Sequence, residues 1–465
     1  MLVVRCWLLG KLREESIKNY ELRIKNFEWN TKINFVMFFF SIIISIFNIN
    51  SIFAQSLDSL VNEAIINNPQ LKSLDYKIKS SEHRVNTMNS LPPPVIGLEI
   101  SNVPFNTVNW LNEPLSQNLT ISQMFHLGGK LDAMADVEKK NVVINEDNLQ
   151  IYKISLTGEI KMSYYNLWLI DKKIDIQQQG IDLLNQLLNS ITTLYEINKI
   201  SQADLFTVKS EIAFNETQLL ILKNQKEAEL YKMNKLLGRN LNSKDISISK
   251  DINIKEFNYS QQELENILAD KNPSLKKMNS MLDMNKFDII ANDKEKVPDL
   301  MLQGMVMRMP KGMFLTTKTP PDMINGMGGV DYGYSLMASI TLPFAPWSKG
   351  KYDAKEQELQ AEIKSIESEK NDMQREMNTQ LKTSFVKMQS SRDLMKLYTD
   401  KVIPLYEKAR AAQISSYQNN QTNINSVIDS NRMLLMQSMN YYMAQADYQM
   451  AIAEIEMMTG ISVNK

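Results

Sequence analysis

Residues 119–130 read LTISQMFHLGGK, and residues 340–351 read ITLPFAPWSKGK. Each stretch begins with apolar and polar residues in alternation, a pattern that predicts a β-strand with two different faces. Each ends in glycine and lysine, and the lysine opens a long segment whose composition favours a helix. The same passage from strand to helix therefore occurs twice in this chain of 465 residues.

Other landmarks repeat at a constant distance. Three pairs of identical residues lie 222 positions apart: Gly128 and Gly350, Tyr195 and Tyr417, and Gly238 and Gly460. An Asn-Pro pair at residues 68–69 returns at residues 272–273. Identical residues at identical spacing indicate an internal repeat. The chain is therefore predicted to contain two copies of one unit, at residues 55–240 and 262–465, joined by a connector at 241–261.

Each predicted unit has the same order of parts. A helix broken at a proline comes first, at residues 59–89 and 262–292. A β-hairpin follows, and an unbroken helix then runs over 130–196 in the first unit and 351–417 in the second. At about 1.5 Å per residue such a helix is roughly 100 Å long, too long to be buried in one compact core. Residues 203–237 have apolar side chains at three- and four-residue spacing, which predicts a coiled-coil partner for the first long helix.

The two predicted hairpins bear on how many chains assemble. Residues 95–100 and 336–342 alternate in polarity and lie between proline and glycine breakers. Two hairpins supply four strands, whereas single-chain transmembrane barrels start at about eight. If these strands lie in a membrane, several chains must share one barrel, and three copies would supply twelve strands.

Composition excludes several classes of function. The chain has 52 basic and 53 acidic side chains and lacks the basic surface that nucleic-acid binding needs, so we expect no nucleic-acid partner. Its 15 glycines and 14 prolines are few, which favours long helices. The one cysteine, Cys6, lies in a segment that we expect to be removed. The mature chain is then predicted to have no disulfide and no cysteine-based metal site.

The first 54 residues are predicted to direct export. Residues 35–47, FVMFFFSIIISIF, form an uncharged run between a basic flank and Ala54. These features describe a secretory signal peptide, which we assign to residues 32–54 with cleavage after Ala54. Residues 1–31 are an N-terminal extension that an over-called start codon would explain. No later segment is apolar enough to span a bilayer as a helix, so the mature chain is expected to enter a membrane as β-strands or not at all.

In this order, and twice, these motifs resemble the TolC-like outer-membrane efflux proteins over residues 55–465. The similarity rests on Asn-Asn-Pro at residues 67–69, on the two strand-to-helix passages and on the unit ends at Gly238 and Gly460. The resemblance implies a mainly α fold. Duplicated long antiparallel helical hairpins would form an α-barrel tunnel in a trimer, and the two β-hairpins would contribute four strands per chain to a shared twelve-stranded transmembrane β-barrel.

The resemblance also implies partners and a location. The chain is expected to be a homotrimer in the outer membrane of a Gram-negative bacterium, in contact with lipid, with a periplasmic helical portion docked on a periplasmic adaptor (membrane fusion) protein and an inner-membrane RND-type pump. It would act as a passive duct. PVIGLEISN at residues 94–102 and LGGK at 127–130 look most like the heavy-metal branch, similar to CzcC and CusC. Drug efflux and type I protein secretion use the same fold and remain open.

The turns at the ends of the long helices are the expected adaptor-docking tips. Family tips place a glycine three residues after a tyrosine, and the tyrosines of this chain are followed there by asparagine. Asparagine tolerates a left-handed backbone better than other non-glycine residues, so we expect the turn geometry to be preserved. The candidate docking residues are Tyr195, Asn198, Ile200, Asp204, Tyr417, Asn420 and Asn423.

A periplasmic entrance gate is expected beyond the second tip. In the drug-type members two acidic residues constrict the entrance, and the matching positions of this chain are Ser426 and Asp429. One carboxylate is therefore lost. Three copies of Asp429 around a threefold axis would favour cations and resist close approach.

Methionines are the only candidate metal ligands. The chain has 29 of them, and four share one parity on the strand expected after residue 298: Met301, Met305, Met307 and Met309. Thioether sulfur suits Cu(I) or Ag(I), although methionine is also a general apolar filler. His83 and His126 have no neighbouring histidine or cysteine and are expected to be structural. We expect no cofactor.

No catalytic signature occurs in the sequence, which lacks GxSxG, HExxH, P-loop and dinucleotide-binding motifs. We therefore do not expect an enzyme. An alternative of another class is a soluble periplasmic coiled-coil adaptor or structural protein. Adaptors carry one long helical hairpin, however, whereas two related hairpins are predicted here.

Overall fold

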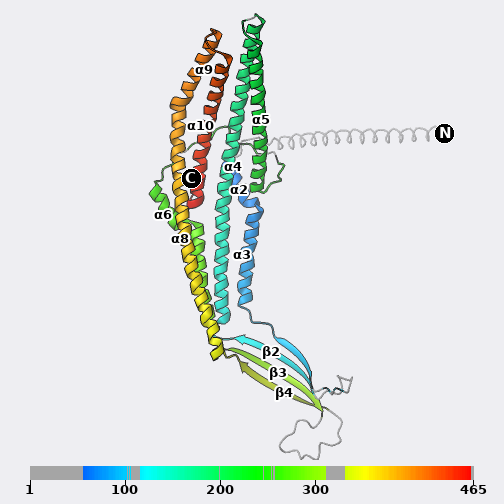
Figure 1. The fold of residues 1–465 in the computed structure, drawn as a ribbon. Coiled ribbons are helices and arrows are strands. Elements are labelled where there is room, and N and C mark those ends of the chain that lie inside the picture. Colours follow the sequence, from blue (N-terminus) through cyan, green and yellow to red (C-terminus); the bar gives the residue numbers. More distant parts are fainter. Residues whose placement is uncertain are drawn as a thin grey trace, which may run out of the picture. The chain divides into compact units, whose positions relative to one another are not determined.

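The computed structural model describes residues 56–101, 103, 105, 116–197, 199–243, 246–252, 254, 257–310 and 330–461. The predicted signal peptide and N-terminal extension lie outside these residues. The described part consists of helices and one four-stranded antiparallel sheet (Figure 1). Its helices include none with the length and apolar character that crossing a membrane requires.

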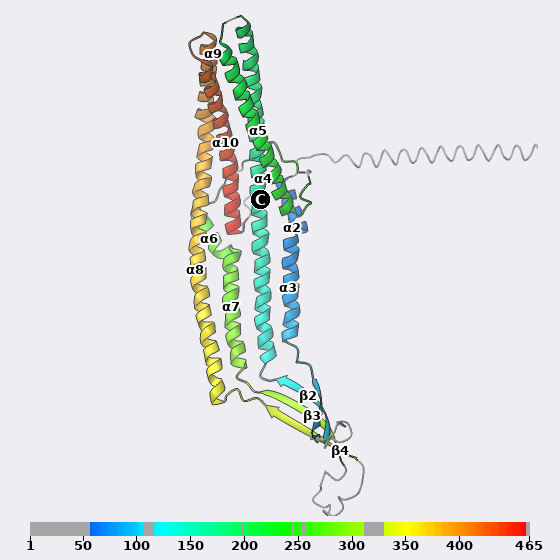
Figure 2. The same cartoon turned by 45° about the vertical axis from the view of Figure 1, so that its right-hand side comes forward.

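The first long helix organises the first half of this part. α4, Lys130–Glu196, has 67 residues and the predicted bounds. α5, Gln202–Leu237, returns along one half of α4, and α3, Pro69–Met88, lies along the other half (Figure 2). α2, Leu57–Asn67, precedes α3. The apolar seam predicted for α5 is buried at Val208, Ile212, Leu219, Met233 and Leu236.

The second half repeats this plan. Its elements are α6 (Gln261–Lys271), α7 (Pro273–Lys294), α8 (Pro346–Leu397), a π-helical turn (Tyr398–Val402), α9 (Ile403–Gln418) and α10 (Ile424–Thr459). α8, the π-helical turn and α9 together form the second long helix. α10 packs against α8 and α9, and α7 packs against α8 (Figure 1).

The second long helix differs from the prediction in two ways. It begins at Pro346 rather than Lys351, because proline fits the first turn of a helix, where its missing N–H needs no partner. It is also not unbroken. Pro404 cannot donate to the helical ladder, and its ring would clash with the carbonyl four residues earlier. The π-helical turn that immediately precedes α9 accommodates this defect and lets the helix continue.

Both copies use the same junction between a broken short helix and the end of a return helix. The Asn68 side chain caps the first turn of α3 and donates from Nδ2 to the carbonyl of Leu236 in α5 at 3.0 Å. Asn272 caps α7 and donates to the carbonyl of Met458 in α10 at 2.7 Å. Each buried asparagine therefore satisfies helix-end groups of two elements at once. This explains the repeated Asn-Pro pair.

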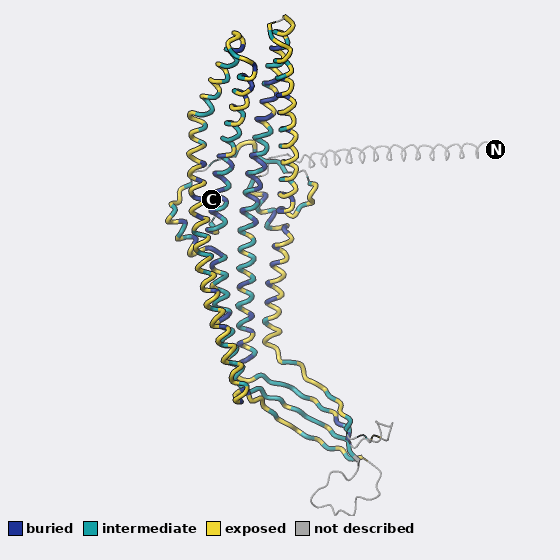
Figure 3. The backbone as a smooth tube through the Cα atoms, in the orientation of Figure 1, coloured by how far each residue is buried: buried dark blue, intermediate teal, exposed yellow. Residues whose placement is uncertain are grey.

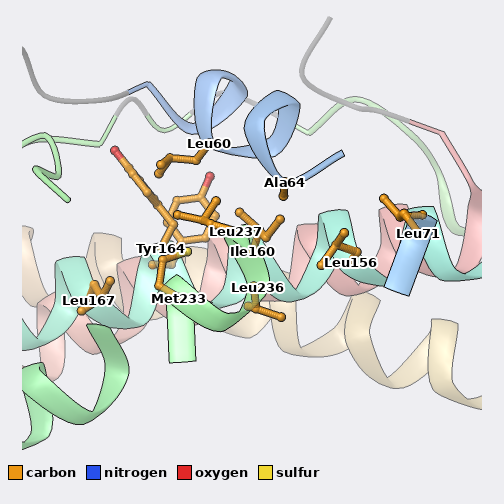
Figure 4. Packing of buried hydrophobic residues seen from close by; sticks show 11 residues of the cluster. Leu60, Ala64, Leu71, Leu156, Ile160, Tyr164, Leu167, Met233, Leu236 and Leu237 are labelled. Carbon is orange, nitrogen blue, oxygen red and sulfur yellow. The ribbon is translucent and has the colours of Figure 1, made fainter. Parts of the chain in front are cut away.

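The largest apolar core surrounds the first junction. Side chains of α2, α4 and α5 meet there, as Figure 4 shows for Leu60, Ile160 and Leu237. All three are completely removed from solvent. Since α2 contributes Leu60 and Ala64 from one side, the short helix closes the core at the point where α5 ends.

The sheet contains both hairpins side by side. β1 (Val95–Ser101), β2 (Ser116–His126), β3 (Asp299–Pro310) and β4 (Val330–Ile340) lie in the order β1-β2-β3-β4, and all neighbours are antiparallel. β4 ends at Ile340, ten residues before the glycine at which the second hairpin was predicted to end. Within the described residues β1 and β4 are edge strands with one neighbour each.

Candidate functional site

The two faces of the sheet have opposite chemistry. Residues that pair directly across antiparallel strands point to the same face. One such row crosses all four strands and is made of Leu98, Leu119, Val306 and Tyr334. Their exposed fractions are 73%, 54%, 53% and 81%. In the neighbouring row of Ile96, Ile121, Gly304 and Leu336, the three apolar side chains are likewise exposed.

The other face is more polar and less exposed. The row between these two consists of Gly97, Thr120, Met305 and Ser335. All four are only partly exposed, and half-buried and exposed stretches are mixed along the strands (Figure 3). In a water-soluble protein the apolar face of a sheet is the covered one. Here the apolar face is the exposed one, which is the arrangement that a lipid environment requires.

The four candidate methionines on β3 share the polar face. Met305 pairs with Thr120, and Met307 pairs with Asn118. The predicted common parity of these methionines therefore corresponds to a common face. Grouped His, Cys, Asp or Glu side chains of the kind that hold a metal ion are absent from the described residues.

The end of the sheet near the helices is held by an ion-paired cluster. The Asp299 carboxylate accepts a hydrogen bond from Nζ of Lys130 at 2.9 Å, and Nδ1 of His126 lies 3.0 Å from the same oxygen. The Lys130 side chain is 2% exposed. His126 thus fixes the passage from β2 to α4 against the start of β3, in keeping with a structural role.

The two helical tips lie at the other end of this part from the sheet and pack against each other (Figure 1). Ile191 and Val208 of the first hairpin form one buried cluster with Ile424 and Val427 of the second. The Tyr417 side chain is buried in this cluster, whereas its repeat Tyr195 is 39% exposed. The two tips are therefore not equivalent in the single chain.

The turn of the second tip has the predicted left-handed backbone. Asn420 has φ of +57°, and it is the one non-glycine residue with positive φ in the described part of the chain. Asn423 then caps α10 by accepting from the backbone N–H of Ser426 at 3.0 Å. The repeat of Asn420 is Asn198, which lies outside the described residues.

A hydrogen bond links the tips. The Tyr417 hydroxyl donates to Oδ2 of Asp204 at 3.5 Å. Burial, together with the nearby carboxylate, raises the pKa of Tyr417 to about 12. Asp204 is itself held by Ser201, whose Oγ accepts from the Asp204 backbone N–H. Ile200 packs half-buried against the same cluster.

The candidate gate residues have local partners. Oγ of Ser426 lies 3.2 Å from Oδ1 of Asn423, so this hydroxyl belongs to the cap of α10. Asp429 is exposed, and its carboxylate lies 3.4 Å from a guanidinium nitrogen of Arg432 one helical turn later. A ring of Asp429 side chains would thus carry three arginines beside its three carboxylates.

Arg432 connects this turn of α10 to a buried network that the sequence did not predict. Its Nε and one terminal nitrogen donate to the two oxygens of Glu211 in α5, at 2.9 and 2.5 Å. The Glu211 carboxylate is 5% exposed and also accepts from Asn215, which in turn accepts from Gln177 of α4. The Glu211 carboxylate holds the pKa of Arg432 above its ordinary value.

One signal for this network was present in the sequence. Asn215 interrupts the apolar seam of α5, and polar residues in such seams are commonly paired across it. Arg432, which donates to Glu211, lies 221 positions after Glu211, on the second hairpin. Only the packing of one hairpin on the other brings the two together.

Comparison with known proteins gives one family match. The family described as outer membrane efflux protein matches residues 60–239. These residues comprise most of α2 and all of α3, the first hairpin, α4 and α5. No curated protein matches the chain.

Solved structures with the same fold cover nearly the whole chain. The outer-membrane channel OprN is 14% identical, with a TM-score of 0.67 over 88% of this chain and 91% of its own. CusC is 16% identical, with a TM-score of 0.66 over 87% and 92% of the two chains. The Campylobacter jejuni CmeC outer membrane channel is 14% identical, with a TM-score of 0.68 over 87% and 85%.

Proposed function

We propose that this chain, whose residues 60–239 match the outer membrane efflux protein family, forms with two further copies a passive duct for heavy-metal cations across the periplasm and the outer membrane. The observation that carries this proposal is the reversed sheet, whose apolar face is more exposed than its polar face. Such a sheet needs lipid on one side and a water-filled space on the other.

The number of strands requires more than one copy. Four strands with two open edges cannot close, and single-chain barrels start at about eight strands. Three copies would join β4 of each chain to β1 of the next and give twelve strands. The two helical hairpins of each chain would then continue this barrel as a tunnel with twelve helical walls.

The helical tips are proposed to dock a periplasmic adaptor, which in turn engages an RND-type pump of the inner membrane. Their exposed residues support this role: Tyr195 and Ile197 are apolar, exposed and placed at the extreme end of the first hairpin. Asp429 and Ser426 are proposed to lie at the entrance, with Arg432 as the third member of the gate. We also propose the division into units at 55–240 and 262–465 with a connector at 241–261.

Heavy-metal export is supported by the LGGK motif at 127–130 and by the PVIGLEISN strand at 94–102. The proposal is tested with a deletion strain challenged separately with Cu, Ag, Zn, Co and Cd salts, drugs and bile salts. Increased sensitivity to metals supports a metal duct. Unchanged metal tolerance with increased sensitivity to drugs or bile salts would overturn the metal assignment and leave drug efflux.

Fractionation of the mature protein tests the class of function. Recovery in the outer membrane supports a duct, whereas recovery as a soluble periplasmic monomer would favour a coiled-coil adaptor or structural protein. A type I secretion role would appear as loss of an exported protein from the medium with unchanged metal and drug tolerance.

A further inference from the structure

The methionines of the sheet are segregated by face. The described strands contain six methionines, and the register places every one of them on the polar face: Met124, Met301, Met305, Met307, Met309 and Met337. Two of these, Met124 on β2 and Met337 on β4, join the group only through strand pairing. Pairing therefore turns a single-strand pattern into a surface that crosses three strands.

Apolar filling does not explain this distribution. The leucines, isoleucines and phenylalanine of the described strands all point to the exposed apolar face, as Leu119, Leu302 and Leu336 illustrate. Methionine used as a general hydrophobic residue would be found among them. Here it shares a face with serine, threonine, asparagine and glutamine instead, so its sulfur is the property that distinguishes it from leucine.

The spacing suits transfer between neighbouring sulfurs. Met301 lies directly opposite Met124 in the register. Met305, Met307 and Met309 follow at steps of two residues, and two residues of a strand span about 6.6 Å. A methionine side chain has three rotatable bonds and reaches across such a distance. Gln303 separates Met301 from Met305 on β3, and Met337, which pairs with Gln303, lies between them on β4. A cation could thus move between neighbouring thioethers of the two strands.

The charges on this face favour cations. Glu99 and Asp331 carry carboxylates on it, and the described strand residues of the face include no lysine or arginine. Arg308, the one basic residue of β3, belongs to the opposite face, where it donates to Gln117. Thioethers are soft ligands and prefer soft cations over Zn²⁺, Mg²⁺ or Ca²⁺.

We propose that the polar face of the sheet is a relay surface for soft monovalent cations, Cu(I) or Ag(I), which bind weakly and successively to its methionine sulfurs. The proposal rests on the duct function and names its substrate class. Several weak sites in series fit conduction, because a cation must be able both to enter and to leave.

The test uses the purified full-length protein in detergent, with Ag(I) as the probe. Bound silver blocks oxidation of a thioether by hydrogen peroxide, and mass spectrometry reads this protection at each methionine. We expect silver to slow oxidation of Met301, Met305 and Met307 by about tenfold, equivalent to roughly 1.4 kcal/mol. The exposed helical residues Met88, Met134 and Met443 serve as internal references and should change little.

Matched variants separate the relay from the duct. M301L/M305L/M307L keeps the apolar volume and removes three sulfurs, and M88L/M134L/M443L removes the same number elsewhere. We expect only the first to weaken silver binding and to lower silver tolerance of cells, while both still reach the outer membrane. Equal protection of sheet and helical methionines in a correctly localised protein would overturn the relay alone. Loss of localisation of the unaltered protein would overturn the duct itself.

Discussion

At the scale of single residues, a left-handed glycine ends the return helix of each unit, but the two glycines have different neighbours. Gly238 and Gly460 close α5 and α10 with φ of +71° and +68°. A Cβ at Gly238 would lie 2.8 Å from the backbone oxygen of Asn67, whereas a Cβ at Gly460 would have no neighbour closer than 3.6 Å. The left-handed backbone thus favours glycine at both positions. Close packing against Asn67 adds a second reason for glycine at Gly238 alone.

We expect Gly238→Ala to destabilise the protein more than Gly460→Ala. Both substitutions carry the cost of a left-handed alanine, about 1–2 kcal/mol, and Gly238→Ala adds a clash with fixed backbone. Denaturant unfolding followed by helical circular dichroism measures the difference. Equal losses of stability in the two variants would show that the backbone at Asn67 can shift and that its close approach to Gly238 is unimportant.

The Tyr417 hydroxyl has a distinct titration. Burial and Asp204 raise its pKa from 10.0 to about 12. The folded state therefore holds this proton more tightly than the unfolded state. The contribution of the Tyr417 hydroxyl to the free energy of unfolding is complete below pH 10, and it is lost as the pH rises from 10 through 12.

We expect the ultraviolet difference titration between wild type and Tyr417→Phe to have its midpoint near 12 when the tip is folded. Asp204→Asn should lower this midpoint, since it removes the neighbouring carboxylate. A midpoint at 10.0 in wild type would mean that Tyr417 is exposed to water and that the tips are apart.

At the scale of elements, the pairing of α5 with α10 decides how firmly the two hairpins are joined. Glu211 is buried, while Arg432 is 54% exposed. An exposed pair contributes little, but removing the partner of a buried carboxylate leaves that carboxylate poorly compensated.

We expect Arg432→Met to lower the free energy of unfolding by roughly 1–2 kcal/mol. This loss is smaller than for a fully buried pair, because the guanidinium is half exposed. Glu211→Gln in the same chain should recover part of this loss, since the amide needs no counter-charge. A double-mutant cycle measures the coupling. Additive effects of the two substitutions would show that the bidentate contact does not hold the hairpins together. Asp429→Asn, on the same turn of α10, serves as a control.

Helix and strand identities followed from the sequence where local signals agreed. α4 has the predicted bounds because a left-handed Gly129 precedes it and the tip turn follows it. The predicted start of the second long helix at residue 351 is wrong because the helix already begins at Pro346, where proline fits the first turn. The π-helical turn is not predicted because hydrophobic periodicity does not distinguish it. The common face of the β3 methionines was predictable from parity. Pairing with Met124 and Met337, and the contact between Glu211 and Arg432, required tertiary structure.

At the scale of the whole molecule, the reversed sheet makes a single chain incomplete. Its apolar face is open over all four strands, and its edges at β1 and β4 are unpaired within the described residues. Exposed apolar surface and open edges both promote association. Lipid on the face and neighbouring copies at the edges, as we propose, would satisfy both needs at once.

Neighbouring residues of β4 provide a test of the lipid face. Leu336 lies on the apolar face at 83% exposure, and Ser335 points to the polar face. We expect Leu336→Lys to reduce recovery of folded protein in the outer membrane, because a lysine on the lipid face costs about 2–4 kcal/mol near the bilayer centre. Ser335→Lys, one position away, should be recovered like wild type. Normal recovery of Leu336→Lys together with reduced recovery of Ser335→Lys would place lipid on the polar face.

The closure of the sheet by three copies is the central claim, and cross-linking between its edges tests it most directly. Leu98 on β1 and Tyr334 on β4 lie in one row of the sheet, and Cys6, the one cysteine of the chain, belongs to the predicted leader. The variant Leu98→Cys/Tyr334→Cys is treated in isolated outer membranes with a flexible bis-maleimide, and the single-cysteine variants serve as controls. For the double variant we expect species of one, two and three chain masses and no larger species, and for each control at most two chain masses. A double variant that stays monomeric, or a ladder that continues beyond three chains, would contradict it.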